Sequence, residues 1–206
     1  FKKYEELMRI PHSICETPFN NFDNKTFSRI SAYKKIFKTQ KSWKGKKIIL
    51  TFEAVAHRAE VFLNGVLVGS HSCGYTAFSF DVTEYLKSSD KENILVVKVD
   101  SRSSLNQPPF GYVVDYMTYG GIYRDVYLEV KNPAFIKDVF VRKKKNSFET
   151  EIQLSCDVPG SMIEQRVEEI DSGDVLCQID TGVSGEIVLT SAVCRAVQQW
   201  SLEKPS

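Results

Sequence analysis

Short segments in which apolar and polar residues alternate constrain the fold of this chain more than any other feature of its sequence. In KIILTFE, residues 47–53, the residues Ile48, Leu50 and Phe52 share one side, and mostly polar residues share the other. Successive side chains of a strand point to opposite faces, so this alternation is typical of strands with one buried face. The pattern recurs from Tyr33 onward. We therefore expect an all-β fold with mostly antiparallel pairing.

Turn residues mark where several of these strands end. Asn64-Gly65 lies between two alternating segments, and it predicts a tight hairpin because a type I′ turn needs positive φ at both central positions. Farther along, Asp81-x-x-Glu84 offers a capping box for one helical turn that runs through Leu86. These signals indicate a series of short strands with brief connections.

One charged residue falls on a face that is otherwise apolar. In the expected strand 121–130, Arg124 has the same parity as the apolar residues, which are Ile122, Val126, Leu128 and Val130. Leaving such a charge buried and unpaired would cost several kcal/mol. We therefore expect Arg124 to pair with a carboxylate, for which Glu53 is a candidate, and to support the loop that precedes it.

The charge balance excludes some classes of partner. The chain has 27 basic and 26 acidic residues, so it has no broad field to hold a nucleic acid or an anionic membrane. The one basic run, residues 142–145, lies between two strand-like segments and is typical of a solvated hairpin tip. Hydrophobic residues make up 42% of the chain, which indicates a packed globular protein.

The cysteines predict no disulfide framework and no zinc site, because their number is odd and no CxxC spacing occurs. The five are Cys15, Cys73, Cys156, Cys177 and Cys194. Buried reduced thiols are the favoured interpretation. A bridge of the immunoglobulin type between Cys156 and Cys194 is disfavoured, because Trp200 follows both cysteines instead of lying between them.

The sequence shows no signal for export, membrane insertion or metal binding. The first 13 residues lack the apolar core of a signal peptide, and no later segment is apolar enough to span a bilayer. We expect a soluble, cytoplasmic protein. The first residue is Phe1 and not Met, so the alternative is an exported protein whose upstream signal has been removed. The histidines, His12, His57 and His71, are scattered, and neither a GxSxG elbow nor a P-loop is present.

The segment DYMTYGGIYRDV, residues 115–126, is the best candidate for chemistry. It lies at the end of a long loop, 101–121, and loops of this length are usually functional or disordered. Asp115 is surrounded in sequence by tyrosines and followed by Gly120-Gly121, which permits a sharp reversal of the backbone. Aromatic rings beside a carboxylate suit a sugar. The alternative is that Asp115 caps a turn and the tyrosines fill the rim of the fold.

A change of pattern near Pro133 predicts a domain boundary. We expect one domain in residues 1–132 and a second in residues 133–206. The second is β-rich but short for a complete seven-stranded sandwich, which needs about 100 residues.

Several ordered motifs resemble the N-terminal sugar-binding domain of glycoside hydrolase family 2, which contains β-galactosidases, β-glucuronidases and β-mannosidases. They include LTFEAVAHRAEVFLNGVLVGSHSCGYTAFSFDVTEYL, NILVVKVDS and YGGIYRDVYLEV, and the likeness runs from about Ile10 to Val130. IPHSI, residues 10–14, is similar to the family's Leu-Pro-His-Asp-Trp but departs from it at Ser13 and Ile14.

The resemblance implies a jelly-roll-like, galactose-binding-like β-sandwich followed by an incomplete immunoglobulin-like β-sandwich. It also implies a downstream TIM barrel that carries the acid/base and nucleophile glutamates, which are absent from this chain. The parent enzyme would then be a retaining exo-β-glycosidase, most similar to β-galactosidases, with two carboxyl groups about 5 Å apart. The chain alone would be inactive.

The resemblance also implies a role for Asp115. In this family, an aspartate six residues before the glycine of Gly-Ile-x-Arg hydrogen-bonds the substrate sugar, and Asp115 lies six before Gly121. In some β-galactosidases this aspartate also ligates sodium. Gly120, Gly121 and Arg124 would then support the loop. Residues 116–118 match neither the galactosidase nor the glucuronidase continuation, so the sugar stays open.

The implied partners are the downstream barrel and a β-linked sugar, with no nucleic acid and no membrane. The parent enzyme could form a homo-oligomer, which the resemblance does not decide. No cofactor is expected within this chain, whereas the parent enzyme could use sodium or magnesium. A free-standing carbohydrate-binding module and a purely structural sandwich are the two alternatives, and the ending at Pro205-Ser206, before a last strand, speaks against both.

Overall fold

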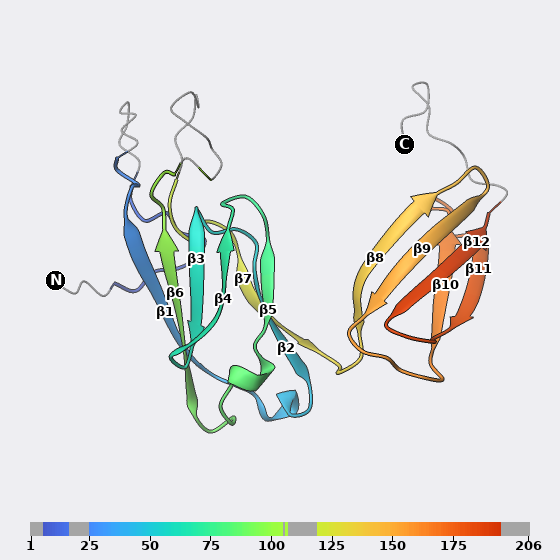
Figure 1. Ribbon diagram of the computed structural model, residues 1–206, viewed down its shortest axis with the longest axis horizontal. Helices are drawn as coiled ribbons and strands as arrows, with labels where there is room; N and C mark the ends of the chain where they lie inside the picture. Colours follow the sequence, from blue (N-terminus) through green and yellow to red (C-terminus); the bar gives the residue numbers. More distant parts are fainter. Residues whose placement is uncertain (1–5, 17–24, 105, 107–118, 195–206) are drawn as a thin grey trace. The chain divides into compact units, whose positions relative to one another are not determined.

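The chain divides into two compact units, residues 1–131 and 132–206, each built from antiparallel strands. A computed structural model describes residues 6–16, 25–104, 106 and 119–194 (Figure 1). Within these ranges the chain forms twelve strands, two short 3-10 turns and no α-helix. The all-β prediction is therefore confirmed. No helix in the described ranges is long and apolar enough to cross a membrane.

The first unit is a sandwich of two antiparallel sheets, in the orders β1-β6-β3-β4 and β5-β2-β7. Its strands are β1 (Ile30–Lys38), β2 (Lys47–Phe52), β3 (Arg58–Leu63), β4 (Val66–Ser72), β5 (Phe78–Asp81), β6 (Glu92–Asp100) and β7 (Val126–Lys131). Its 3-10 turns are η1 (Lys41–Trp43) and η2 (Thr83–Tyr85). The turn predicted after Asp81 is η2, and the Asp81 carboxylate accepts the Thr83 backbone N–H at 3.0 Å.

The core of this unit lies between the two sheets. It contains alternate residues of β2 and β3, including Leu50, Phe52, Val61 and Leu63, all of which are nearly inaccessible to solvent. The inner face predicted for residues 47–53, which contain β2, is therefore confirmed. Burial of large apolar side chains is the main force that holds such sheets together.

The Asn64-Gly65 hairpin forms as predicted, and Asn64 also links separate elements. The two residues have φ values of 54° and 86°, as a type I′ turn requires. The Asn64 amide donates to the Tyr85 carbonyl at 2.8 Å and to the Asn93 side chain at 3.0 Å, and it accepts the Ile94 backbone N–H at 3.0 Å. The hairpin tip is thus attached to η2 and β6.

The second unit has two sheets, in the orders β12-β9-β8 and β10-β11. Its strands are β8 (Ile136–Lys143), β9 (Ser147–Leu154), β10 (Met162–Glu168), β11 (Val175–Gly182) and β12 (Ile187–Val193). The basic run lies at the tip of the β8–β9 hairpin, as predicted: Arg142 and Lys143 end β8, and Lys144 and Lys145 lie in the turn, where the Lys144 N–H donates to the Ser147 carbonyl at 2.8 Å.

The core of the second unit is small and leaves β8 uncovered. Its buried cluster is Ile152, Leu154, Val183 and Val188. Val139 pairs in register with Ile152 and so has the same parity, yet Val139 is 46% exposed whereas Ile152 is 4% exposed. Among the described residues, the facing sheet has two strands, too few to cover all three strands of the larger sheet.

The prediction that all cysteines are reduced is wrong. Cys177 of β11 is bonded to Cys194, which follows β12, with Cα atoms 5.5 Å apart. Cys15, Cys73 and Cys156 are free thiols, so the disfavoured Cys156–Cys194 bridge is indeed absent. Sequence spacing did not indicate the bond because the pairing depends on how β11 and β12 meet in space.

We expect loss of this disulfide to destabilise the second unit. The bonded cysteines are 17 residues apart, and closing a loop of about 15 residues contributes roughly 3 kcal/mol by restricting the unfolded chain. The double variant Cys177→Ser/Cys194→Ser should lower the free energy of unfolding by about that amount, measured by urea denaturation. Cys156→Ser is the matched control. Reaction of all five cysteines with a thiol reagent in the unreduced, denatured protein would contradict the bond.

Candidate functional site

The long loop 101–121 re-enters the sandwich through a stem that is bonded on both sides. On one side, the His12 N–H donates to the Ile122 carbonyl at 2.7 Å, and the Ile14 N–H donates to the Gly120 carbonyl at 3.0 Å. On the other side, Gly121 exchanges two backbone hydrogen bonds with Ala56, at 3.0 and 3.2 Å. We call residues 120–122 the stem. Its backbone direction is fixed by two segments that lie far away in sequence.

A tyrosine and a histidine reinforce one side of the stem. The Tyr33 hydroxyl lies 2.8 Å from the His12 Nδ1 atom, and its oxygen also accepts the Ile122 backbone N–H. Burial raises the pKa of Tyr33, and the hydrogen bond from Ile122 opposes this rise. Tyr33 thus joins the His12 segment, the edge strand β1 and the stem.

Both stem glycines are sites where a side chain has no room. Gly121 has a φ of 118°, which L residues rarely adopt. A Cβ atom on Gly121 would lie 2.7 Å from the His12 carbonyl oxygen and 2.7 Å from the Tyr33 hydroxyl. A Cβ atom on Gly120 would overlap Ser101. The glycine pair therefore allows the close approach of the two bonded segments.

The start of the loop is anchored by an ion-pair cluster. The Asp100 carboxylate at the end of β6 pairs with Arg102 at 2.8 Å and with Arg58 at 3.1 Å. Hydrogen bonding to Arg102 is the largest cause that lowers the pKa of Asp100, to about 2. Next to it, the Ser101 hydroxyl donates to the Ala56 carbonyl at 2.8 Å. Both ends of the loop are thus attached to the same part of β3 and the residues before it.

The described tyrosines near the stem have structural contacts. Tyr119 meets the Phe27 ring edge to face, with centroids 5.4 Å apart. The Tyr123 hydroxyl donates to the Gly74 carbonyl, which attaches the residue after the stem to the turn after β4. These contacts support the interpretation that at least these two tyrosines serve packing.

The candidate ligand residue, Asp115, lies outside the described residues, as do Tyr112 and Tyr116. Its proposed role stays a prediction. In the ranges that the structure covers, no group of three or more His, Cys, Asp or Glu side chains is arranged to hold a metal ion.

The prediction that Arg124 is buried is wrong. Arg124 is exposed and lies in a bend, and β7 begins only at Val126. The strand cannot extend back through Arg124 because Gly121 pairs with Ala56 in a separate bridge, and the backbone turns between the two. No ion pair joins Arg124 to Glu53 or to another carboxylate among the residues with described positions.

The sequence analysis did not predict the roles of His12, Tyr33 and Ser101 in holding the loop. Each of these residues acts through a hydrogen-bond partner that is far away in sequence, so no local pattern indicates its role.

Comparison with known proteins decides the family. The family model for the sugar binding domain of glycosyl hydrolases family 2 matches residues 8–133, which is more than half of the chain. The chain belongs to glycoside hydrolase family 2. The matched range includes the whole stem, the Asn64-Gly65 hairpin and every strand of the first unit.

Relatives within the family extend the likeness into the second unit. The chain is 38% identical over 199 residues to a β-galactosidase of Thermoanaerobacter pseudethanolicus, covering 96% of this chain and 25% of that protein. It is 40% identical over 109 residues to a β-glucuronidase of Formosa agariphila, covering 50% of this chain and 11% of that protein. The matched region thus spans a quarter or less of the length of each of these two relatives.

A solved structure shares the fold. The crystal structure of a putative β-galactosidase from Bacteroides fragilis matches with a TM-score of 0.80 at 23% identity, covering 97% of this chain and 32% of that one. At 23% identity, the match supports a shared fold and nothing about function. It agrees with a fold of two β-sandwich units that spans about a third of the matched chain.

Proposed function

We propose that this chain is the non-catalytic N-terminal region of a retaining exo-β-glycosidase of the β-galactosidase type. The observation that carries the proposal is the match to the β-galactosidase of Thermoanaerobacter pseudethanolicus, which covers 96% of the chain and therefore both units. The match to β-glucuronidases of similar identity covers about half of the chain. The catalytic carboxylates would lie in a downstream barrel, where they act about 5 Å apart.

The role of the first unit would be to present the loop 101–121 to the substrate. The bonded stem and the Asp100 cluster fix both ends of the loop, which supports this role because a ligand residue must be held in place to contribute to binding. Within the loop, Asp115 would accept hydrogen bonds from hydroxyl groups of the sugar. The same carboxylate is our candidate ligand for sodium, since carboxylate oxygen suits a hard cation.

A panel of p-nitrophenyl glycosides tests the proposal on the full-length enzyme. We expect the β-D-galactoside to give the highest kcat/KM, ahead of the β-D-glucuronide and the β-D-mannoside. The 206-residue chain alone should hydrolyse none of them, because it lacks the barrel. A preference for the glucuronide would overturn the β-galactosidase assignment. Millimolar binding of monosaccharides to the 206-residue chain, measured by titration calorimetry, would instead support a free-standing carbohydrate-binding module.

A further inference from the structure

The tip of the β3–β4 hairpin, Asn64-Gly65, is a place where the chain can modify itself. An asparagine followed by glycine is prone to deamidation, because glycine has no side chain to keep its nitrogen from the asparagine side chain, and asparagine is among the thermolabile residues. Gly65 is exposed, and a Cβ atom there would have no neighbour within 4 Å. Water therefore reaches this turn freely.

Three hydrogen bonds hold the Asn64 side chain away from this reaction. Its Nδ2 atom donates to the Tyr85 carbonyl at 2.8 Å and to the Asn93 Oδ1 atom at 3.0 Å. Its Oδ1 atom accepts the Ile94 N–H at 3.0 Å. The side chain is thus held toward η2 and β6. It must leave these partners before its carbonyl carbon can meet the Gly65 nitrogen.

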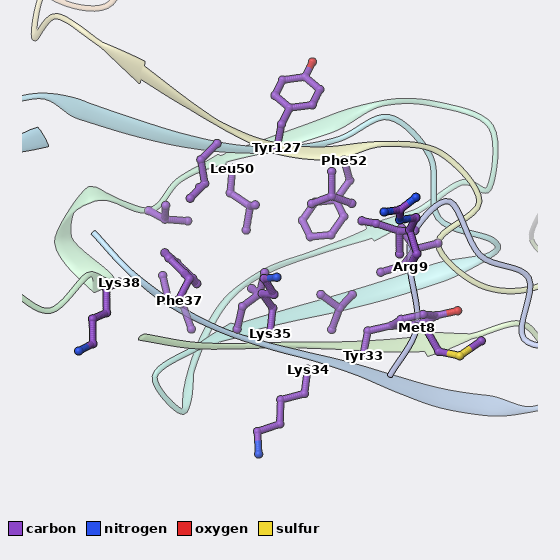
Figure 2. A pocket seen from close by; sticks show the side chains of 18 of the residues that line it. Met8, Arg9, Tyr33, Lys34, Lys35, Phe37, Lys38, Leu50, Phe52 and Tyr127 are labelled. Atoms are coloured by element: carbon purple, nitrogen blue, oxygen red, sulfur yellow. The ribbon is translucent and has the colours of Figure 1, made fainter. Parts of the chain in front are cut away.

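The core next to the hairpin tip has fewer packing contacts than a filled core. Leu63 precedes Asn64 and Leu95 follows Ile94, and both leucines line an apolar groove of about 890 Å³ between β1 and β7 (Figure 2). Protein interiors are packed to the density of organic crystals, and side chains beside a void lose contacts on that side. Opening the tip therefore breaks fewer contacts than opening a filled sandwich would.

The product of deamidation does not fit the closed tip. A carboxylate oxygen in place of the Nδ2 atom would face the Tyr85 carbonyl oxygen and the Asn93 Oδ1 atom, with no hydrogen between them. Asn93 is fully buried and cannot turn its amide around, because the same Oδ1 atom also accepts the Lys87 N–H at 2.8 Å. Unpaired buried acceptors carry the full cost of their lost hydration.

We propose that Asn64 is a deamidation site that the closed hairpin protects, and that the reaction makes a transient opening of the tip permanent. The Gly65 nitrogen attacks the Asn64 side-chain carbonyl carbon and closes a succinimide, while the bond to Nδ2 breaks and ammonia leaves with the proton of the Gly65 amide. Water then opens the ring at either carbonyl and gives aspartate or isoaspartate. No oxidant, reductant or cofactor takes part.

Incubation in heavy-oxygen water tests the site in the intact full-length protein. Opening of the succinimide adds a heavy oxygen atom to the product, so mass spectrometry of the peptide that contains Asn64 measures its conversion. In urea, where the tip is open, we expect a mixture of aspartate and isoaspartate. In the native protein, the conversion should be at least about tenfold slower, because it proceeds only from the opened tip.

Two results of this experiment would overturn the proposal. If Asn64 is not converted in urea, the site is wrong. If it is converted equally fast in urea and in the native protein, the three hydrogen bonds do not protect it. Neither measurement uses catalysis, so the inference does not depend on which sugar the enzyme binds.

Two substitutions test the effect of the product on stability. Asn64→Asp gives one of the two products, whereas Asn64→Gly accepts the φ of 54° and removes the same hydrogen bonds without adding a charge. At about pH 8, urea denaturation should show an unfolding equilibrium constant at least about threefold larger for Asn64→Asp than for Asn64→Gly.

The pH dependence separates the charge from the lost hydrogen bonds. The difference between the two variants should shrink toward about pH 4, near the ordinary pKa of an Asp side chain, because a protonated carboxyl group can donate one hydrogen bond. If Asn64→Asp is as stable as Asn64→Gly at about pH 8, the closed tip accepts the product and the proposal fails.

Discussion

Asp115→Ala should lower kcat/KM of the full-length enzyme by about ten- to a hundred-fold, because a hydrogen bond to a charged group contributes roughly 1.5–3 kcal/mol. The loop 101–121 is attached at both ends, by the stem and by the Asp100 cluster. Its sequence includes the carboxylate that our proposal places against the sugar hydroxyls. The loss should therefore fall on the interaction with substrate and not on the stability of the first unit.

Steady-state kinetics with the preferred glycoside would measure this effect, and thermal unfolding would check that the variant is folded. Asp90→Ala is a suitable control, because Asp90 lies in the turn before β6, at the other end of that strand from the loop (Figure 1). An unchanged kcat/KM in Asp115→Ala would reject the role of Asp115. It would leave the family assignment intact, since the assignment depends on residues 8–133 as a whole.

Gly121→Ala should destabilise the first unit by about 2–6 kcal/mol. Two costs add. A side chain at positive φ costs roughly 1–3 kcal/mol, and forcing atoms into a packed site costs a further 1–3 kcal/mol or so. At this position the new Cβ atom would lie 2.7 Å from the His12 carbonyl oxygen, and neither backbone segment can move without breaking the hydrogen bonds of the stem.

A matched control separates the two costs. Gly45 has a φ of 74°, but a Cβ atom there would have no neighbour within 4 Å. Gly45→Ala therefore carries the cost of the backbone conformation without the overlap. Urea denaturation of both variants should show that Gly121→Ala loses clearly more stability than Gly45→Ala. Equal losses would mean that the stem can shift to accept a side chain, and that it is not the rigid support described above.

The parts of the fold that follow from local sequence were predictable. The inner face of β2 was predictable because side chains of a strand alternate strictly, and the hairpin at Asn64 was predictable because its turn needs two positive φ values. The same reasoning failed for Arg124. Parity holds only while a strand continues, and here the backbone bends between the Gly121 bridge and Val126.

Contacts between distant segments were not predictable from patterns. The Cys177–Cys194 bond and the Tyr33–His12 hydrogen bond depend on how strands meet in space. The segment 10–14 shows why departures from a motif can mislead. Ile14 contributes its backbone N–H to the stem, so the identity of its side chain does not decide whether that contact forms.

The fixed ends of the loop have a consequence for how the family diversifies. Because the Asp100 cluster and the stem hold both ends of the loop, we expect the sandwich to stay folded when the stretch between them changes in length and composition. Each doubling of a loop's length costs only about 0.6 kcal/mol in closure entropy. If the loop contacts the sugar as we propose, insertions and replacements in this one segment would change the sugar preference at little cost to folding.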